Sequence, residues 1–166
     1  MISRDQSYCS FKMEDISVQN HMRKYTRNGR SPLPNSDAVS RVMSANKGKD
    51  TLPELELRRA LREIGQSGYR IHKKGIPGRP DIAFVGQRVA VFVNGCFWHR
   101  CPYCNPSAPK THADFWTEKF QKNIERDALK CQALRENGWK VLIFWECEIK
   151  KDSLAVARKI SRAIHE

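Results

Sequence analysis

The sequence predicts an α/β fold in which a mixed β-sheet lies between layers of helix. Three observations support this fold class. A helical segment precedes two short apolar runs that read as a hairpin, a long helical segment follows them, and a last apolar run comes near the C-terminal end. The order helix, hairpin, helix, strand is typical of an α/β sandwich with a mixed central sheet.

Two helices are predicted before the hairpin. The segment NSDAVSRVMSAN begins like a short helix, with Ser36 as a possible N-cap. The segment DTLPELELRRALREIGQSG is a clearer helix, because Thr51 can cap it and Pro53 suits its first turn. Its apolar residues share one face, as an amphipathic helix requires: Leu57, Leu61 and Ile64.

The remaining elements follow the same patterns. The segment PDIAFVGQRVAVFV predicts a hairpin, with strands at 81–85 and 88–93 around a tight Gly-Gln turn. A long helix is predicted over 112–137, closed by Gly138. The apolar run KVLIFW then predicts a final strand that leads into ECEIKKD, and a short amphipathic helix finishes the chain.

Charge predicts the kind of partner. The 166-residue chain has a net charge of +12, which favours a polyanionic partner, most often nucleic acid. An anionic membrane surface is the alternative, but we find no bilayer-spanning apolar run and no signal-peptide pattern, so we expect a cytoplasmic, nucleoid-associated protein without a membrane. No oligomer seam is visible, so a monomer is expected.

Domain organisation follows from composition. Residues 1–35 are basic, contain Gly and Pro, and show no sustained apolar period, so they predict a flexible N-terminal extension. A basic arm that touches phosphates is the alternative interpretation of this segment. Residues 36–166 form the predicted folded domain.

Three of the six cysteines are clustered in the segment NGCFWHRCPYC. Cys96, Cys101 and Cys104 have C-x4-C-x2-C spacing, which is typical of a zinc knuckle in a protein with no secretory signal. Tetrahedral zinc needs a fourth N or S ligand, and four protein ligands leave no open position for a reacting water, so the zinc is predicted to be structural. The alternative is that these cysteines bind no metal and are free thiols packed in the core. The candidates for the fourth ligand are Cys147, His99, His112 and Cys131.

Cys147 lies just past the final strand, and it reaches the knuckle if that strand pairs beside 88–93. Cys131 lies on the apolar side of the long helix and is more typical of a small core residue. His99 could bind zinc, but it could not then act as a base.

An acidic residue lies where a core residue is expected. On a helical wheel Asp127 falls within the apolar stripe of the long helix, and a carboxylate that faces a core needs a partner. His99 is one candidate, because a buried carboxylate can fix the tautomer of a histidine and raise its basicity. A structural salt bridge is an equally weighted alternative. The other residues of the stripe are Trp116, Phe120, Ile124, Cys131 and Leu134.

Asp81 opens the first hairpin strand directly after Gly-Arg-Pro. A carboxylate that projects from the start of a strand suits a magnesium ligand, because hard cations prefer oxygen ligands. A Pro-Asp dipeptide alone is more often a turn or a cap, so this evidence is weak.

Taken together, these segments resemble the very short patch repair (Vsr) endonuclease family, which cuts DNA next to T:G mismatches left by deamination of 5-methylcytosine. The segments that carry the resemblance run in family order from about 40 to 150: MSANKGKDTLPELELRRAL, GIPGRPDIAF, VAVFVNGCFWHRCPYC, PKTHADFWTEKFQKNIERD and LRENGWKVLIFWECEI. The combination of GCFWH, a cysteine knuckle, NIERD and WEC is highly specific. The first 35 residues are not covered.

The resemblance implies a restriction-endonuclease-like mixed β-sheet flanked by helices, with a structural zinc site. It implies Mg²⁺ bound by Asp81 and the backbone carbonyl of Val93, with Glu54 at an acidic position near the metal. His99 would be the general base or proton shuttle, oriented by Asp127. The zinc ligands would be Cys96, Cys101, Cys104 and Cys147.

The resemblance also implies how DNA is bound. Phe97, Trp98 and Trp116 would wedge into the duplex beside the mismatch, where unstacking costs least, and Met43 would insert from the other groove. On the residues alone, Trp116 reads as a core residue, and packing around zinc is the alternative for the other two aromatic residues. Basic residues are candidate phosphate contacts, with a solvated charge as the alternative for each: Arg41, Lys47, Lys49, Arg79 and Arg100.

Two departures from the family pattern matter. The E-x-K motif of the wider PD-(D/E)xK nuclease group is absent, because the second hairpin strand ends VFVN. Where some family members have Thr-His before the glycine, this chain has Val93 and Asn94. Asn94 can hydrogen-bond a phosphate or a water but cannot take a proton, which leaves more of the catalysis to His99.

The predicted function is Mg²⁺-dependent nicking of one strand beside the T of a T:G mispair in double-stranded DNA. A cytosine-5 methyltransferase and mismatch-repair proteins are possible functional partners. The alternatives are a Vsr-like restriction or defence nuclease that needs no mismatch, and a zinc-stabilised DNA-binding module without activity.

Overall fold

The computed structural model describes residues 26–27, 31–32 and 37–166. The predicted extension over 1–35 and the proposed Ser36 cap therefore lie almost entirely outside the described residues. The elements, in chain order, are β1 (Thr26–Arg27), β2 (Ser31–Pro32), α1 (Asp37–Ser44), α2 (Leu52–Glu63), β3 (Arg70–Ile71), β4 (Ile82–Phe84), β5 (Val89–Asn94), α3 (Ala113–Glu136), β6 (Lys140–Trp145), α4 (Glu146–Lys151) and α5 (Ser153–His165).

The central sheet is mixed, as predicted. Its strand order is β3-β4-β5-β6. Strand β4 pairs antiparallel with both β3 and β5, whereas β5 and β6 are parallel. The hairpin turn is longer than the predicted Gly-Gln pair, because it spans residues 85–88. Strand β3 was not predicted, since two residues are too few to show a period.

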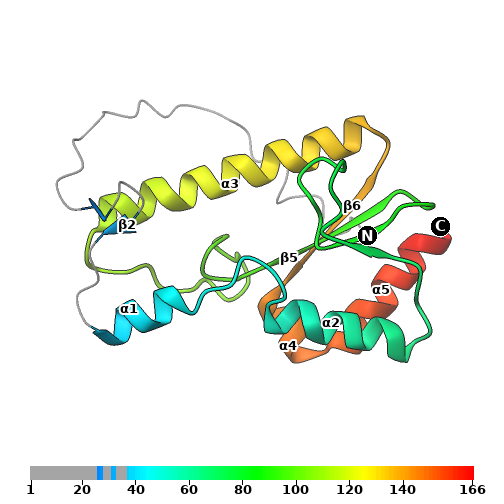
Figure 1. The fold of residues 1–166 in the computed structure, drawn as a ribbon, viewed down its shortest axis with the longest axis horizontal. Coiled ribbons are helices and arrows are strands. Elements are labelled where there is room, and N and C mark those ends of the chain that lie inside the picture. Colours follow the sequence, from blue (N-terminus) through cyan, green and yellow to red (C-terminus); the bar gives the residue numbers. More distant parts are fainter. Residues whose placement is uncertain (1–25, 28–30, 33–36) are drawn as a thin grey trace.

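Helices cover both faces of the sheet (Figure 1). Alternate strand residues explain why: Ile82 and Val91 pack with α2, α4 and α5 in the larger core, whereas Ala83 and Ala90 face Leu134 of α3. The larger core also contains Leu57 and Leu61 of α2, as the apolar face of that segment predicted. Burial of one face of each helix therefore fixes its position on the sheet.

The parallel pair β5–β6 positions the cysteine loop. Asn94 pairs with Trp145, so both strands end at the same edge of the sheet. The loop after β5 and the start of α4 consequently meet, as expected if the last strand lies beside 88–93. The segment ECEIKKD, which had been left unassigned, forms helix α4 for six of its seven residues.

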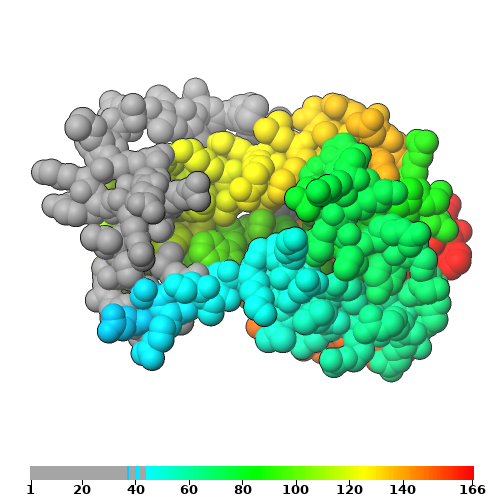
Figure 2. Space-filling view, in the orientation of Figure 1, coloured from blue at the N-terminus to red at the C-terminus, as the bar shows by residue number. Residues whose placement is uncertain are grey.

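Helix α3 matches the predicted long helix to within one residue at each end. Its C-terminal part packs on the sheet, while its N-terminal part extends past it on the same side as α1 (Figure 1). In the space-filling view, the segment 37–50 lies at the surface along the lower edge of that side (Figure 2). Within the described part of the chain, no helix has the length and apolar character needed to cross a membrane.

Candidate nuclease site

Asp81 lies one residue before β4, at the entrance to the hairpin. Its Oδ2 accepts a hydrogen bond of 2.8 Å from the backbone N–H of Val93, which fixes the carboxylate against β5. Its Oδ1 lies 3.7 Å from Nδ1 of His72. The structure thus brings together two of the predicted magnesium-binding positions, Asp81 and Val93.

The pKa of Asp81 is shifted upward. Burial raises this pKa to about 6, and the nearby Glu54 carboxylate contributes to the rise, while the Val93 N–H bond and the charges of His72 and His99 oppose it. Asn94, which follows Val93 on β5, lines a pocket with Asp127, so the hairpin strand that contacts Asp81 also reaches the partner of His99. A carboxylate in this state is stabilised by an added cation.

Glu54 lies in the first turn of α2 and is 4% exposed. Its Oε1 accepts a hydrogen bond of 2.7 Å from the hydroxyl of Thr51, the N-cap residue, and its Oε2 accepts one of 3.1 Å from the backbone N–H of Asp50. Arg58, also buried, pairs with Asp50 at 2.6 Å and approaches Glu54 at 3.5 Å. Glu54 therefore both caps α2 and faces the Asp81 region through His72, whose Nε2 is 3.4 Å away.

His99 and Asp127 form a direct pair. Nδ1 of His99 hydrogen-bonds to Oδ2 of Asp127, which joins the cysteine loop to α3. Lys130 Nζ donates to Oδ1 of the same carboxylate at 3.2 Å. Both interpretations of Asp127 therefore apply, since it contacts a histidine and a cation. Although burial alone would raise the pKa of Asp127, His99 and Lys130 hold it below its ordinary value.

Asn94 ends β5 and is 6% exposed. It lines one small pocket together with Asp127 and Lys130. The departure from the family pattern at position 94 therefore lies beside the His99–Asp127 pair. An asparagine there offers an amide dipole but no titrating proton.

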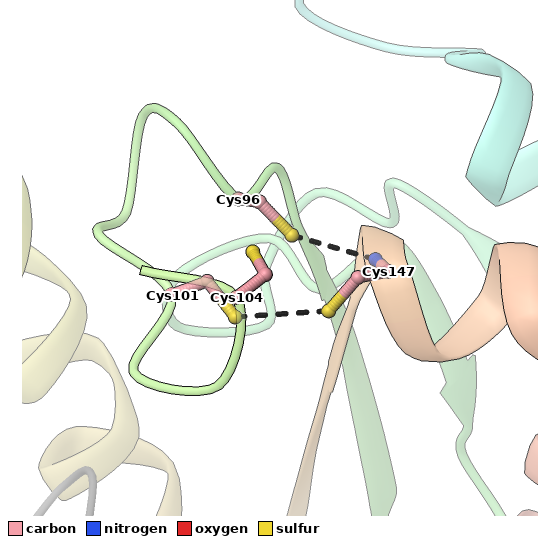
Figure 3. A group of neighbouring side chains, drawn as sticks. All are labelled: Cys96, Cys101, Cys104 and Cys147. Carbon is pink, nitrogen blue, oxygen red and sulfur yellow. Dashed lines mark hydrogen bonds between the residues drawn. The ribbon is translucent and has the colours of Figure 1, made fainter. Parts of the chain in front are cut away.

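The four cysteines implied by the resemblance come together (Figure 3). The ligand atoms of Cys96, Cys101, Cys104 and Cys147 all lie within 4.8 Å of one another. The Sγ atoms of Cys101 and Cys147 are 3.7 Å apart, which matches the edge of about 3.8 Å in a tetrahedron with Zn–S bonds of about 2.3 Å. The backbone N–H of Cys147 donates to Cys96 Sγ at 3.4 Å.

This donor set fits a zinc ion. Burial raises the pKa of Cys147 to about 11, so a thiolate there needs a nearby dication. The other candidate ligands lie outside the cluster, among the residues that the structure describes. Cys131 is instead 2% exposed on α3, as its position on the helix predicted, and His99 is left to pair with Asp127.

The aromatic residues of the cysteine loop pack against the start of α3. Ring centroids of Phe97 lie 5.5 Å from Trp116 and 5.3 Å from Phe120, and those of Trp98 and Trp116 lie 6.0 Å apart. Trp116 is buried, as a core residue would be, whereas Phe97 and Trp98 are partly exposed. Arg100 does not extend freely, because its guanidinium stacks 4.8 Å above the Phe120 ring.

The remaining candidate DNA contacts lie elsewhere. Lys47 and Lys49 are exposed in the segment between α1 and α2, and Arg79 is exposed in the loop before Asp81. Arg41 is exposed on α1, and the side chain of Met43 on that helix lies outside the described residues.

The sequence analysis missed three polar residues of this region. Asn123 is 5% exposed, and its side-chain amide donates to the Trp98 carbonyl at 2.9 Å, which ties the loop to α3. It lies four residues before Asp127 on the same stripe, so the wheel could have found it. Lys130 contacts Asp127, one turn further along the helix. His72 had no local signal, because its contacts with Glu54 and Asp81 exist only in the fold.

Comparison with known proteins identifies the family. A family model described as DNA mismatch endonuclease Vsr matches residues 35–105. Type II nicking enzyme V.NaeI of Lentzea aerocolonigenes is 40% identical over 134 residues, covering 76% of this chain and 78% of the relative. DNA mismatch endonuclease Vsr of Escherichia coli (strain K12) is 39% identical over 111 residues, covering 67% of this chain and 70% of the relative. The chain therefore belongs to the Vsr family and is a DNA endonuclease.

Proposed function

We propose that this endonuclease nicks one strand of double-stranded DNA beside the T of a T:G mispair, by Mg²⁺-dependent phosphodiester hydrolysis. The observation that carries the proposal is the arrangement along β5, where Val93 contacts Asp81 and the next residue, Asn94, lines a pocket with the Asp127 of the His99–Asp127 pair. One group can accept a proton from water and the other can hold a cation, which are the two requirements of this reaction. The Escherichia coli relative is named a DNA mismatch endonuclease, which supports a mismatched duplex as the target.

Asp81 is the residue we assign to the catalytic cation, with the backbone carbonyl of Val93 beside it. The residues fit Mg²⁺, because the Asp81 carboxylate is partly buried yet accessible and Val93 lies against it. When bound, Mg²⁺ supplies charge neutralisation on the phosphate and stabilisation of the leaving oxygen. Glu54 adds negative charge to this region and so favours a cation there.

His99 is the residue we assign to activation of the attacking water. The carboxylate of Asp127 accepts the hydrogen bond from Nδ1, so the proton resides on that nitrogen and the lone pair on Nε2 can accept a proton from water. Asn94 beside this pair is assigned to orienting a phosphate oxygen or a water by hydrogen bonding. The products are a 5′-phosphate and a 3′-hydroxyl.

The cysteine cluster is assigned to structural Zn²⁺. Cys96 and Cys101 flank His99 in sequence, and Cys147 anchors them to the start of α4. Holding both ends of this six-residue segment fixes where His99 can point. Removal of the zinc ion would therefore disturb the His99–Asp127 pair, although zinc itself takes no part in the chemistry.

The aromatic cluster is assigned to mismatch recognition. Phe97 and Trp98 are partly exposed at the tip of the loop, where they can enter a base step, and Trp116 supports them from α3. A mispair is stacked and paired less tightly than a Watson–Crick pair, so a wedge enters there at lower cost. Met43 would enter from the other groove. Arg79, Lys47 and Lys49 are exposed cations that would position the backbone.

The test is strand-specific cleavage of two labelled duplexes that differ only in one T:G mispair, with Mg²⁺ and with the variants Asp81→Ala and His99→Ala. His165→Ala is the matched control, because this histidine is exposed near the C-terminus, on α5. Nicking only beside the mismatched T, lost in the first two variants and kept in the control, supports the proposal. Equal cutting of both duplexes would replace it with a nuclease that needs no mismatch. Cleavage that survives in EDTA would refute the metal-dependent step.

A further inference from the structure

His72 occupies a position between two acidic residues of the proposed catalytic centre, yet the reaction described above assigns it no role. Its two ring nitrogens face in different directions, with Nε2 3.4 Å from Glu54 Oε2 and Nδ1 3.7 Å from Asp81 Oδ1. An imidazole between a carboxylate of a helix and a carboxylate of a sheet links the two elements that form the site.

The imidazole is held in place. Its side chain is only 15% exposed, and its backbone adopts a positive φ of 44°, which is uncommon for a residue other than glycine or asparagine. Nε2 is shielded from solvent and has no hydrogen-bond partner of acceptable geometry among the described residues. A buried nitrogen without a hydrogen-bond partner calls for an explanation, such as a bound ion or a catalytic role.

A separate cation site on the Glu54 side is disfavoured by charge. Asp50, Glu54 and His72 present ligand atoms within 4.8 Å of one another. However, Arg58 already supplies a positive charge to both acids, and Glu54 already accepts hydrogen bonds from the N-terminus of α2. The positive end of the helix dipole lies there too. Glu54 is therefore better suited to accept a hydrogen bond from His72 than to bind an ion.

The Asp81 side has the opposite character. In the described part of the chain, no lysine or arginine forms an ion pair with Asp81, and its Oδ1 faces His72 Nδ1. Two ligand atoms that each lie about 2.1 Å from one ion are about 3.0 Å apart at a right angle and about 3.6 Å apart at an angle near 120°. The observed 3.7 Å separation is thus within a small side-chain adjustment of joint coordination.

We propose that Nδ1 of His72 is a direct ligand of the divalent metal ion bound by Asp81, and that metal binding turns Nε2–H of the same ring onto Glu54 Oε2, the acceptor that now lies 3.4 Å away. This arrangement is a carboxylate–histidine–metal triad, in which the outer carboxylate fixes the tautomer of the ligand. It rests on the proposed function only in placing the catalytic cation at Asp81. It gives Glu54 a specific role, since Glu54 acts through the imidazole rather than on the ion.

The nitrogen ligand has a consequence for metal choice. Imidazole nitrogen binds Mn²⁺, Co²⁺ and other first-row transition ions more favourably than it binds Mg²⁺ or Ca²⁺, which prefer oxygen. The centre should therefore bind Mn²⁺ more tightly than Mg²⁺, and the difference should depend on His72. A centre formed only by carboxylate and carbonyl oxygens would show no such dependence on this residue.

The experiment measures Mn²⁺ binding to the zinc-loaded protein without DNA, by calorimetry and by pulsed EPR, which detects ¹⁴N of a coordinated imidazole. His72→Asn is the main variant, because asparagine tolerates a positive φ and removes only the imidazole. His165→Ala is the matched control, and His99→Ala excludes the neighbouring histidine as the source of ¹⁴N. Asp81→Ala tests whether the same ion contacts both ligands, and thermal unfolding verifies that each variant folds.

The expected result is a ¹⁴N signal in the wild type, His165→Ala and His99→Ala, and its loss in His72→Asn and in Asp81→Ala. The Mn²⁺ dissociation constant should rise roughly 10- to 100-fold in His72→Asn, and that of Mg²⁺ should change less. A ¹⁴N signal that persists in folded His72→Asn would overturn the proposal, as would one that persists in Asp81→Ala. Because no DNA is present, failure of T:G-dependent nicking would not affect this metal-binding result. Failure of the metal-binding result would likewise not affect the nicking test.

Discussion

Asp81 is partly buried and Asp127 is buried, and their surroundings shift their pKa values in opposite directions. Asp81 lies beside a second acid and receives one backbone hydrogen bond, and its pKa is raised to about 6. Asp127 receives hydrogen bonds from His99 and Lys130, and its pKa is lowered. Asp127 thus has its positive partners within the chain, whereas the contact of Asp81 is His72 at 3.7 Å, which agrees with the proposal that Asp81 binds an added cation.

The first way to test this comparison is to neutralise each acid and measure nicking. Asp81→Asn should lower the rate of nicking a T:G duplex at least about 10³-fold, because loss of a metal ligand removes several kcal/mol of transition-state stabilisation. Asp127→Asn should lower it by about 10²-fold, since His99 remains but is no longer held in the right tautomer. Single-turnover kinetics at saturating enzyme measure both.

The control for these variants is Asp152→Asn, because asparagine caps a helix as well as aspartate and Asp152 caps the distant α5. It should nick at the wild-type rate. An Asp127→Asn enzyme that retains full activity would remove the carboxylate from the mechanism and leave it a structural partner of Lys130.

The second test loosens the loop that carries His99 without altering either acid. Cys147→Ser should reduce bound zinc to less than one ion per chain and lower nicking by about 10-fold or more, because support around a metal site matters on that scale. Cys131→Ala is the matched control, since Cys131 is buried on α3 away from the cluster. Bound zinc is measured by elemental mass spectrometry, and nicking activity is measured on the T:G duplex. Full activity in a zinc-free Cys147→Ser enzyme would contradict the assigned structural role.

The contrast between these regions also explains what the sequence could reveal. Periodicity predicted the hairpin, α3 and β6 and thus the mixed sheet, because each buries residues at regular intervals. The same periodicity exposed Asp127 as a polar residue on an apolar stripe. Asn123 shares that stripe and is bound to the Trp98 carbonyl, so the pattern contained it as well.

Other features could not be read from local pattern. His72 lies between Glu54 and Asp81 only because α2 and the start of β4 converge, and no spacing records that contact. Helix α4 is short and mostly charged, so its pattern is too brief to separate a helix from a loop. The cysteine cluster could be predicted in part from local pattern. Spacing identified three of its members, and only the parallel pairing of β5 with β6 brings in Cys147.

The third test compares the free energy of unfolding of Asp127→Asn and Asp81→Asn, which should change in opposite directions. A lowered pKa in the folded state means that ionised Asp127 stabilises the fold at neutral pH, with the benefit lost as pH falls through its folded pKa. Asp127→Asn should therefore decrease the free energy of unfolding by about 1–3 kcal/mol at neutral pH. A raised pKa means that ionised Asp81 destabilises the fold above pH 6, so Asp81→Asn should increase this free energy by about 2 kcal/mol.

Urea denaturation of both variants in buffer without divalent cations other than bound zinc measures these changes. The increase for Asp81→Asn should disappear at low pH, where the wild-type carboxyl is protonated in both states. Destabilisation by both substitutions at neutral pH would contradict the contrast between the two acids, because it would show that their surroundings are equivalent.

The smallest effect concerns pH and divalent metal affinity. A proton and a cation compete for Asp81, so the affinity for Mg²⁺ should be constant above about pH 6 and fall about tenfold for each pH unit below it. Asp127 adds nothing to this profile, because its lowered pKa keeps it ionised throughout that range. Binding isotherms between about pH 5 and pH 8, taken without DNA, locate the midpoint. A midpoint near the ordinary range of an exposed aspartate would mean that Asp81 is not the site of competition.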